Sequence, residues 1–228
     1  LGIATSLYDQ GAKVIIFDLN QKKIDKLNKK IISYNVDITN YELVQKTVNN
    51  IINKYGQIDI LVNNAGVIYN EPLINIMDPI NMKHSYDNFK KNLEINLNSV
   101  FIMSSIVVEQ MALKRTKGVI INLSSISANG NAGQTVYSAA KAGVEAMTKA
   151  WAKELGGFGI RTVAIAPGFI NTESTNDALN EKIIKHIKSN TPLKRLGEIE
   201  NISQSVLYIV ENDFINGAVL DVNGGLTI

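Results

Sequence analysis

The sequence predicts one α/β domain built on a doubly wound parallel sheet with helices on both faces. Three observations support this fold: strand-like and helix-like segments alternate along the chain, the strands are continuous apolar runs rich in β-branched residues, and polar residues follow the strands. Continuous apolar runs are expected where helices cover both faces of a sheet. No linker, repeat or low-complexity tract interrupts residues 1–228, so we expect a single domain.

Strands and helices are expected in regular alternation. The expected strands are 13–19, 31–38, 58–66, 118–125, 160–168 and 216–225. The expected helices are 2–10, 20–29, 40–55, 86–114, 134–156, 176–188 and 198–211. Gly11 stands where a glycine commonly ends a helix, and Pro167-Gly168 breaks the chain after a strand.

The composition argues against several classes of protein. There is no cysteine, which excludes disulfides and thiolate metal sites, and the net charge of +2 with scattered basic residues does not favour nucleic acid. No apolar run approaches the roughly 18 residues of a membrane span, and the stretch LGIATSLYDQGAKV at 1–14 does not have the basic, then apolar, then small-residue order of a signal peptide. His84 and His186 stand alone, so we expect surface or helix residues and no metal. We expect a cytoplasmic protein without nucleic-acid or membrane partners.

The chain opens directly on a helix, at Leu1-Gly2. A doubly wound nucleotide site normally begins with a strand, a glycine-rich loop and a helix whose first N–H groups hold a pyrophosphate. Only the last glycine of such a loop, Gly2, is available here. We therefore expect that the first strand and most of the phosphate loop are absent from this sequence.

Polar residues gather where the predicted strands end. They are Asp18, Asp37, the NNAG of 63–66, the serine pair 124–125 and the PGFINT of 167–172. In a doubly wound sheet, ligands bind outside the carboxyl ends of the strands. The sequence therefore predicts a ligand site along this edge.

Tyr137 and Lys141 suggest acid–base chemistry. They stand four residues apart in a helix, so both side chains lie on one face. A phenol with a pKa of about 10 is a poor proton donor or acceptor at neutral pH, and a nearby ammonium would lower that pKa. Tyr137 would then be the general acid when a carbonyl is reduced and the base in the reverse direction. The alternative is a buried tyrosine beside a solvated lysine.

Five motifs in order resemble the short-chain dehydrogenase/reductases, and the resemblance runs from Gly2 to Ile228. They are NNAG at 63–66, EINLNSVF at 94–101, INLSS at 121–125, YSAAK at 137–141 and APGFINT at 166–172. The resemblance implies a Rossmann-type fold and a nicotinamide-dependent oxidoreductase acting on CH–OH or C=O groups. It gives Lys141 a second role, a hydrogen bond to the nicotinamide ribose, and it makes Asn96 the holder of a water linked to that lysine.

The family also places a serine hydroxyl on the substrate carbonyl. The phrase INLSS favours Ser125, whereas the spacing of thirteen residues before the tyrosine favours Ser124. We favour Ser125, because strand alternation determines the face that a side chain takes while the following loop can lose a residue. Ser124 is then expected to be structural.

Asp18 favours NAD(H) over NADP(H). It ends the strand expected at 13–19, which is the second strand of the fold when the absent first strand is counted. At this place an acidic residue accepts hydrogen bonds from the ribose hydroxyls, and its carboxylate would repel a 2′-phosphate. Asp18 could also serve as a helix N-cap. The resemblance implies that Asp37 and Ile38 contact the adenine and that the backbone of Asn64, Ala65 and Gly66 approaches the cofactor. It also implies that Thr172 and the backbone of Ile170 reach the nicotinamide carboxamide, and that Pro167 and Gly168 contact the cofactor.

Resemblance to two branches of the family narrows the range of expected substrates. The long segment from Gly66 to Asn96, with Asp18 and YIVENDFINGAVLDVNGG, resembles the NAD-linked 3-hydroxyacyl-CoA dehydrogenases. APGFINTE and GNAGQTVYSAAKAGV resemble the 3-oxoacyl-ACP reductases, where ACP is the acyl carrier protein. Both branches interconvert 3-oxo and 3-hydroxy thioesters, so we expect an acyl-CoA or acyl-ACP substrate.

Residues 173–190 are expected to cover the substrate and to be the most mobile part of the chain, and their lysines with Lys194 and Arg195 would meet an anionic carrier. Apolar residues cover much of the circumference of the long helices 86–114 and 134–156, which indicates burial on more than one side. The resemblance implies that these helices form the faces of a homotetramer. Two alternatives stay open: a dehydrogenase of a steroid, polyol or sugar, and a catalytically silent dinucleotide-binding module.

Overall fold

The computed structural model describes residues 1–24, 31–172, 175 and 179–228. Two predicted segments lie partly outside this description. They are residues 25–29 of the predicted helix 20–29, and residues 173–174 and 176–178 of the predicted substrate cover. The rest is an α/β fold in which all paired strands are parallel, as predicted.

The described strands form two sheets. β1 (Ile15–Asp18) pairs with β2 (Ile32–Asn35), and a second sheet has the order β3 (Ile60–Asn63), β4 (Gly118–Leu123), β5 (Ile160–Pro167) and β6 (Val219–Val222). One hydrophobic cluster joins the two sheets, because Phe17 and Tyr34 pack against the cluster that contains Leu61 and Ile120. Parallel pairing brings the carboxyl ends of β3, β4 and β5 to one edge, where the motif residues follow.

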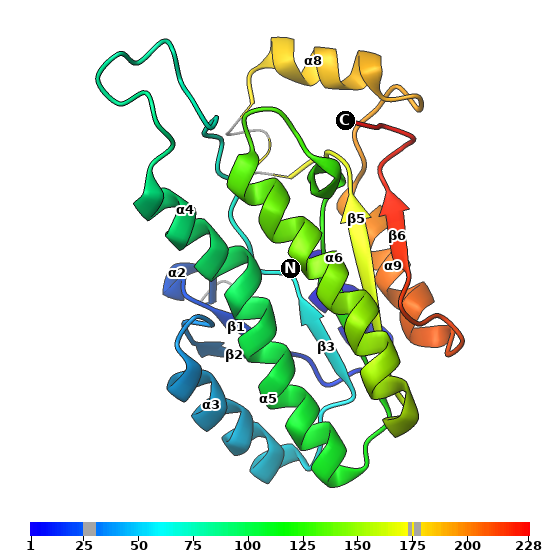
Figure 1. Ribbon diagram of the computed structural model, residues 1–228. Helices are drawn as coiled ribbons and strands as arrows, with labels where there is room; N and C mark the ends of the chain where they lie inside the picture. Colours follow the sequence, from blue (N-terminus) through cyan, green and yellow to red (C-terminus); the bar gives the residue numbers. More distant parts are fainter. Residues whose placement is uncertain (25–30, 173–174, 176–178) are drawn as a thin grey trace.

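Helices cover both faces of the larger sheet (Figure 1). On one face α3 (Tyr41–Tyr55) and α5 (Ser99–Lys114) share a buried cluster with Ile120, while α6 (Thr135–Leu155) lies along β5. On the other face α1 (Gly2–Asp9) and α9 (Ile199–Glu211) pack against Val119 and Ile121. Successive β4 residues thus face opposite layers, as the pleat of a strand requires.

Local signals explain where the helices begin and end. Asn40 caps α3, since its side chain accepts the Leu43 N–H over 2.9 Å, and Gly56 ends the helix with φ of 93°. α2 (Gln21–Ile24) and α8 (Glu181–Asn190) are shorter, and short 3-10 turns η2 (Ile126–Asn129) and η3 (Gly156–Phe158) flank α6.

The predicted helix 86–114 is divided by a π-helical turn. It consists of α4 (Tyr86–Leu93), the π-helical η1 (Glu94–Asn98) and α5. By length and composition alone, this is the one stretch in the described parts of the chain that would suffice to cross a membrane. Such a helix is equally expected in the core of a soluble protein, and here α4 packs against α6 and α5 against α3.

His84 departs from expectation. The sequence predicted a surface or helical histidine, but the side chain is buried in the segment before α4. Its Nδ1 lies 3.1 Å from the Glu71 carbonyl oxygen, and its ring packs edge-on against Phe89. The burial arises because the chain between β3 and α4 folds back on itself, which the sequence pattern did not reveal.

Candidate active site

The predicted catalytic side chains meet at the carboxyl end of β4. Ser125 follows this strand, Tyr137 and Lys141 occupy the first turns of α6, and Asn96 lies in the π turn. The contacts of α6 with β4, η1 and η2 hold these elements together. Residues far apart in the sequence thereby share one edge of the sheet.

Tyr137 is buried beside Ser125. Its side chain is 8% exposed, and the Ser125 side chain is hydrogen-bonded to it. Burial raises the pKa of Tyr137 above its ordinary value, while the bond with Ser125 works in the opposite direction. The Ser125 hydroxyl also accepts the Ser127 N–H over 3.1 Å, which ties it to the start of η2.

Lys141 lies deeper than a solvated lysine would. It is 4% exposed, its Nζ donates to the Leu123 carbonyl oxygen over 2.7 Å, and the Nζ is 5.7 Å from the centre of the Tyr137 ring. Burial lowers the pKa of Lys141 to about 8. The prediction that Tyr137 and Lys141 share one helix face is confirmed. The prediction that the ammonium lowers the pKa of Tyr137 is wrong, because that pKa is raised. Loss of solvent around the phenol dominates, because the ammonium is directed at the β4 carbonyl.

The two serines have different partners. The Ser124 hydroxyl donates to the Glu145 carboxylate over 2.7 Å and lies 3.4 Å from the Lys141 carbonyl oxygen, so it fastens α6 to β4. Ser125, in contrast, contacts the phenol. The geometry thus gives Ser125 the position beside Tyr137 and Ser124 a packing role.

Asn96 is fully buried and held by the backbone after β3. Its Oδ1 accepts the Val67 N–H and its Nδ2 donates to the Val67 carbonyl oxygen, each over 3.0 Å. Gly66 lets this approach occur: a Cβ there would lie 2.8 Å from Asn96 Oδ1 and 3.6 Å from Lys141 Nζ. Gly66 therefore lies against both side chains, and a larger residue would push into them.

Asn92 is a polar partner of Asn96 that the sequence analysis missed. It is buried, and its Oδ1 accepts the Asn96 Nδ2 over 2.9 Å. The spacing of four residues to Asn96 would have suggested that the two side chains share a face. Without the site assembled, an asparagine in this asparagine-rich stretch carried no distinguishing signal.

A buried chain of amides and hydroxyls underlies the site. Asn63 of β3 donates to Asn122 of β4 over 2.8 Å and to Ser104 of α5 over 2.9 Å. Asn122 in turn donates to Thr148 of α6 over 2.9 Å. These bonds fix α5 and α6 against the strands whose ends carry the site. Asn63 and Asn122 had been noted only as members of NNAG and INLSS, while Ser104 and Thr148 had not been noted.

Comparison with known proteins shows the family that the sequence motifs suggested. A family model described as enoyl-(acyl carrier protein) reductase matches residues 1–227. The 3-oxoacyl-[acyl-carrier-protein] reductase of Thermotoga maritima is 37% identical over 100% of this chain and 94% of its own length. The corresponding reductase of Buchnera aphidicola is 38% identical over 99% of this chain and 91% of its own. The chain is a short-chain dehydrogenase/reductase.

As a short-chain dehydrogenase/reductase the protein is an oxidoreductase acting on CH–OH or C=O groups, and its family uses a nicotinamide cofactor. The residues predicted to bind the adenosine half lie at the ends of β1 and β2. Asp18 closes β1 and accepts the Asn20 N–H over 2.8 Å. Asp37 accepts both the backbone and the hydroxyl of Thr39, and Ile38 packs onto the core cluster.

The other residues predicted to contact the cofactor lie at the ends of β3 and β5. Asn64, Ala65 and Gly66 are exposed directly after β3. Pro167 ends β5, and the Gly168 N–H donates to the Val222 carbonyl oxygen over 3.0 Å. A Cβ on Gly168 would lie 2.8 Å from the Asn223 Cα, so the backbones approach closely here. Ile170 packs inward, and Thr172 contacts Thr175 through their hydroxyls.

Gly2 begins α1 against α9. A Cβ there would lie 2.1 Å from the Ile199 Cγ2, and the neighbouring Ile3 packs onto the cluster that also takes in Val62 of β3. The start of α1 is thus close to the β3 end of the site. At Gly2, Gly66 and Gly168 the missing side chain leaves room for Ile199, Asn96 and Asn223. The exposed backbone of residues 64–66 and the Asp18 carboxylate are groups of the kind that bind a dinucleotide.

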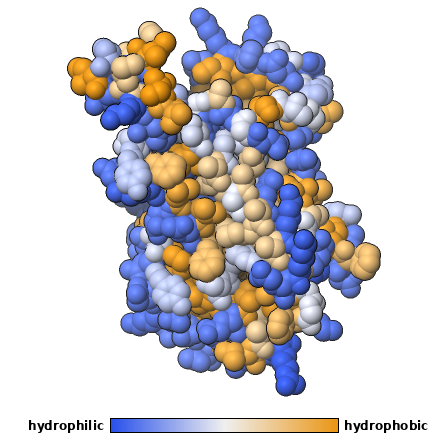
Figure 2. Space-filling view, in the orientation of Figure 1, coloured by the Kyte–Doolittle hydropathy of each residue, from blue (hydrophilic) through white to orange (hydrophobic). Residues whose placement is uncertain are grey.

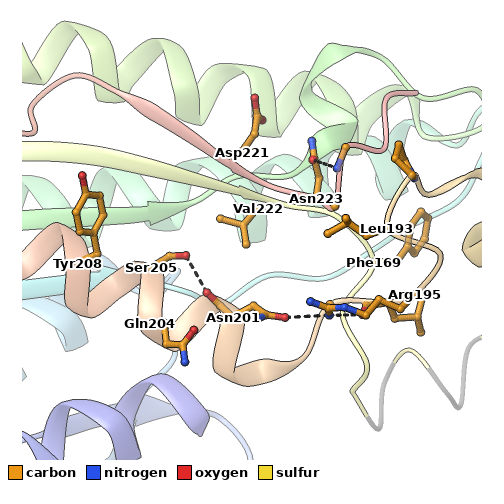
Figure 3. A pocket seen from close by; sticks show the side chains of 15 residues that line it. Phe169, Leu193, Arg195, Asn201, Gln204, Ser205, Tyr208, Asp221, Val222 and Asn223 are labelled. Carbon is orange, nitrogen blue, oxygen red and sulfur yellow. Dashed lines mark hydrogen bonds between the residues drawn. The ribbon is translucent and has the colours of Figure 1, made fainter.

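A separate hollow lies beside β6. A cavity of about 720 Å³ opens between the end of β6 and α9 (Figure 3). It is lined by side chains that include Phe169, Leu193, Arg195, Asn201, Tyr208 and Val222. None of the predicted site residues of this short-chain dehydrogenase/reductase lines it.

Proposed function

We propose that this protein interconverts a 3-oxoacyl and a 3-hydroxyacyl thioester carried by ACP or CoA. The observation that carries the proposal is the buried Tyr137 beside the half-buried Ser125 and the buried Lys141, in a chain whose relatives are named 3-oxoacyl-[acyl-carrier-protein] reductases. A bound nicotinamide cofactor would supply or accept the hydride.

The side chains divide the work on the substrate oxygen. The Ser125 hydroxyl would hydrogen-bond to the carbonyl oxygen, and Tyr137 would donate its proton to the same oxygen. Because burial raises the pKa of Tyr137, the phenol stays protonated at neutral pH. The protonated form is the one that donates a proton when the carbonyl is reduced.

Lys141 and Asn96 would support this transfer. The Lys141 ammonium would hold the nicotinamide ribose and favour the phenolate left by proton donation. Asn96, locked to Val67, would hold a water linked to that ammonium.

NAD(H) is the proposed cofactor, in preference to NADP(H). The Asp18 carboxylate at the end of β1 would accept hydrogen bonds from the ribose hydroxyls and repel a 2′-phosphate. Gly2, Asp37, Ile38 and the 64–66 segment would hold the rest of the adenosine diphosphate, and Pro167, Gly168, Ile170 and Thr172 the nicotinamide end.

The test is reduction of an acetoacetyl thioester with NADH or NADPH. Tyr137→Phe should lower kcat by about 10²- to 10⁴-fold while leaving cofactor binding unchanged. A crotonyl thioester belongs in the same assay, since the matching family is described as an enoyl reductase. Turnover of the double bond alone would overturn the proposal, and cofactor binding with no turnover of any carbonyl would favour a silent module.

We further propose a cytoplasmic homotetramer. Its faces would be the outer surfaces of the helices 86–114 and 134–156, where Phe101 is an exposed aromatic residue.

A further inference from the structure

Residues 71–84, between β3 and α4, form a hairpin with a defined backbone. Ile74 pairs with Lys83 in antiparallel fashion, and the Asn75 N–H donates to the Met82 carbonyl oxygen over 2.7 Å. At the tip, the Asp78 carboxylate accepts the N–H groups of Ile80 and Asn81. Turn residues of this kind satisfy their own backbone, so the hairpin has a fixed shape.

The hairpin presents apolar side chains to solvent. Ile76, Met77 and Ile80 at its tip are 76%, 86% and 87% exposed. Leu73, Ile74 and Met82 are exposed along its arms. Figure 2 shows these residues as a protruding apolar lobe, at the upper left. A single exposed apolar residue needs no explanation, but a contiguous group on one hairpin marks a binding surface.

The base of the hairpin is tied to the candidate active site. The backbone N–H and carbonyl of Val67 are both hydrogen-bonded to the Asn96 side chain. The Asn70 side chain accepts a hydrogen bond from Nε2 of Gln134 over 2.7 Å, and Gln134 stands three residues before Tyr137. The Glu71 carboxylate accepts the Ser85 N–H over 2.7 Å. Ile68, between these anchors, is 67% exposed. Exposed apolar residues therefore stand on both sides of these polar anchors: Ile68 follows the residue that Asn96 holds, and the hairpin side chains lie beyond Glu71.

The facing side of the site has the opposite character. Figure 1 shows the hairpin and α8 on either side of the space beyond the carboxyl ends of β3 and β5. α8 exposes Lys182, Lys185 and Lys188. The hairpin carries Lys83 but also Glu71 and Asp78, so it offers no excess of positive charge to the phosphates of CoA or to an acidic carrier. The anionic groups of the carrier are complementary in charge to the lysines of α8. The hairpin surface is complementary to the uncharged, apolar acyl chain.

We propose that the face formed by Ile68 and the 71–84 hairpin binds the acyl chain of the substrate beyond its reacting carbonyl. This inference rests on the proposed function and deepens it: the protein selects 3-oxoacyl groups with long straight chains. Each methylene fully buried on such a surface is worth a factor of about four in kcat/KM. The thioester would lie with its carrier toward α8 and its chain toward the hairpin.

The test compares N-acetylcysteamine thioesters of 3-oxobutanoate and 3-oxodecanoate, which carry no CoA or ACP. Wild type should show a kcat/KM at least about tenfold higher for the ten-carbon substrate. Ile68→Ser, and separately the triple variant Leu73→Ser, Ile76→Ser, Ile80→Ser, should each lose most of that preference while turning over the four-carbon substrate as wild type does. Leu113→Ser, which changes an equally exposed leucine at the end of α5, should keep the preference.

The outcomes separate the two proposals. If wild type and both hairpin variants share one chain-length ratio, the acyl-chain surface is refuted while the reductase assignment stands. If wild type reduces neither thioester in the free or carrier-bound form, the reductase assignment itself fails. Since the substituted side chains are exposed, we expect the circular dichroism and unfolding midpoint of the variants to match wild type, and Ile68→Ser alone decides the matter should the triple variant misfold.

Discussion

The Lys141 ammonium is buried at the end of β4, where its Nζ donates to the Leu123 carbonyl oxygen. A lysine in the unfolded chain has a pKa of about 10.5, whereas burial lowers the pKa of Lys141 to about 8 in the folded protein. The cost of burying the charge is therefore fully present below pH 8. It disappears as the pH rises toward 10.5, because there the unfolded chain holds a proton that the folded protein has lost.

The pH dependence of unfolding tests this burial. Between pH 8 and about pH 9.5, the free energy of unfolding of wild type should rise by about 2 kcal/mol relative to that of Lys141→Met, which has no proton to lose. Urea unfolding at the two pH values measures the difference. Lys149→Met changes an exposed lysine of the same helix and should track wild type; an equal course for Lys141→Met would show that the pKa of Lys141 is ordinary.

Single side chains of the site were predictable only as far as spacing determines them. Four residues separate Tyr137 from Lys141, and this alone puts both on one helix face. The raised pKa of Tyr137 depends on how closely the surrounding layers enclose the phenol, and Asn92 gains its partner only when α4 runs into the π turn. Enclosure and partnership are properties of the assembled fold, so no local pattern encodes them.

The junction of β3 and β4 depends on a residue without a side chain. At Gly118, the first residue of β4, a Cβ would lie 2.5 Å from the Asp59 carbonyl oxygen and 3.0 Å from the Met111 Cε. The backbone oxygen cannot move aside without disturbing the start of the sheet. Gly118→Ala should therefore lower the free energy of unfolding by about 1–3 kcal/mol, measured by urea denaturation.

Gly157→Ala is the matched control for this substitution. A Cβ at Gly157 meets nothing within 4 Å. Its free energy of unfolding should stay within about 0.5 kcal/mol of wild type. Equal stabilities for the two variants would mean that the β3–β4 junction relaxes around the added methyl group.

The regular elements were predicted closely because their signals are local. The apolar runs predicted as strands 118–125 and 160–168 are Gly118–Leu123 and Ile160–Pro167 in the structure, and the pattern at 40–55 is the helix Tyr41–Tyr55. The π turn at Glu94–Asn98 escaped because an apolar period continues across it with little change. The division into two sheets also escaped, since strand pairing is a relation between distant segments.

Assembly is expected to use the outer faces of the long helices. Light scattering should give a mass about four times the 25.0 kDa of one chain. Phe101→Glu places a charge on the exposed face of α5 and should yield dimers or monomers, because a buried unpaired carboxylate is costly at an interface. Tyr41→Glu, at the exposed start of α3, should leave the mass unchanged. A wild-type monomer would refute the tetramer.

The π turn has a further consequence for the molecule as a whole. A five-residue turn holds more chain per rotation than the α-helical turns around it, so it changes which side chains of the 86–114 rod share a face. On one side of it α4 carries Asn88, which donates to Glu71 at the base of the hairpin, and on the other side α5 belongs to the hydrophobic interior. One continuous rod thereby links the hairpin to the core, with Asn96 at the junction.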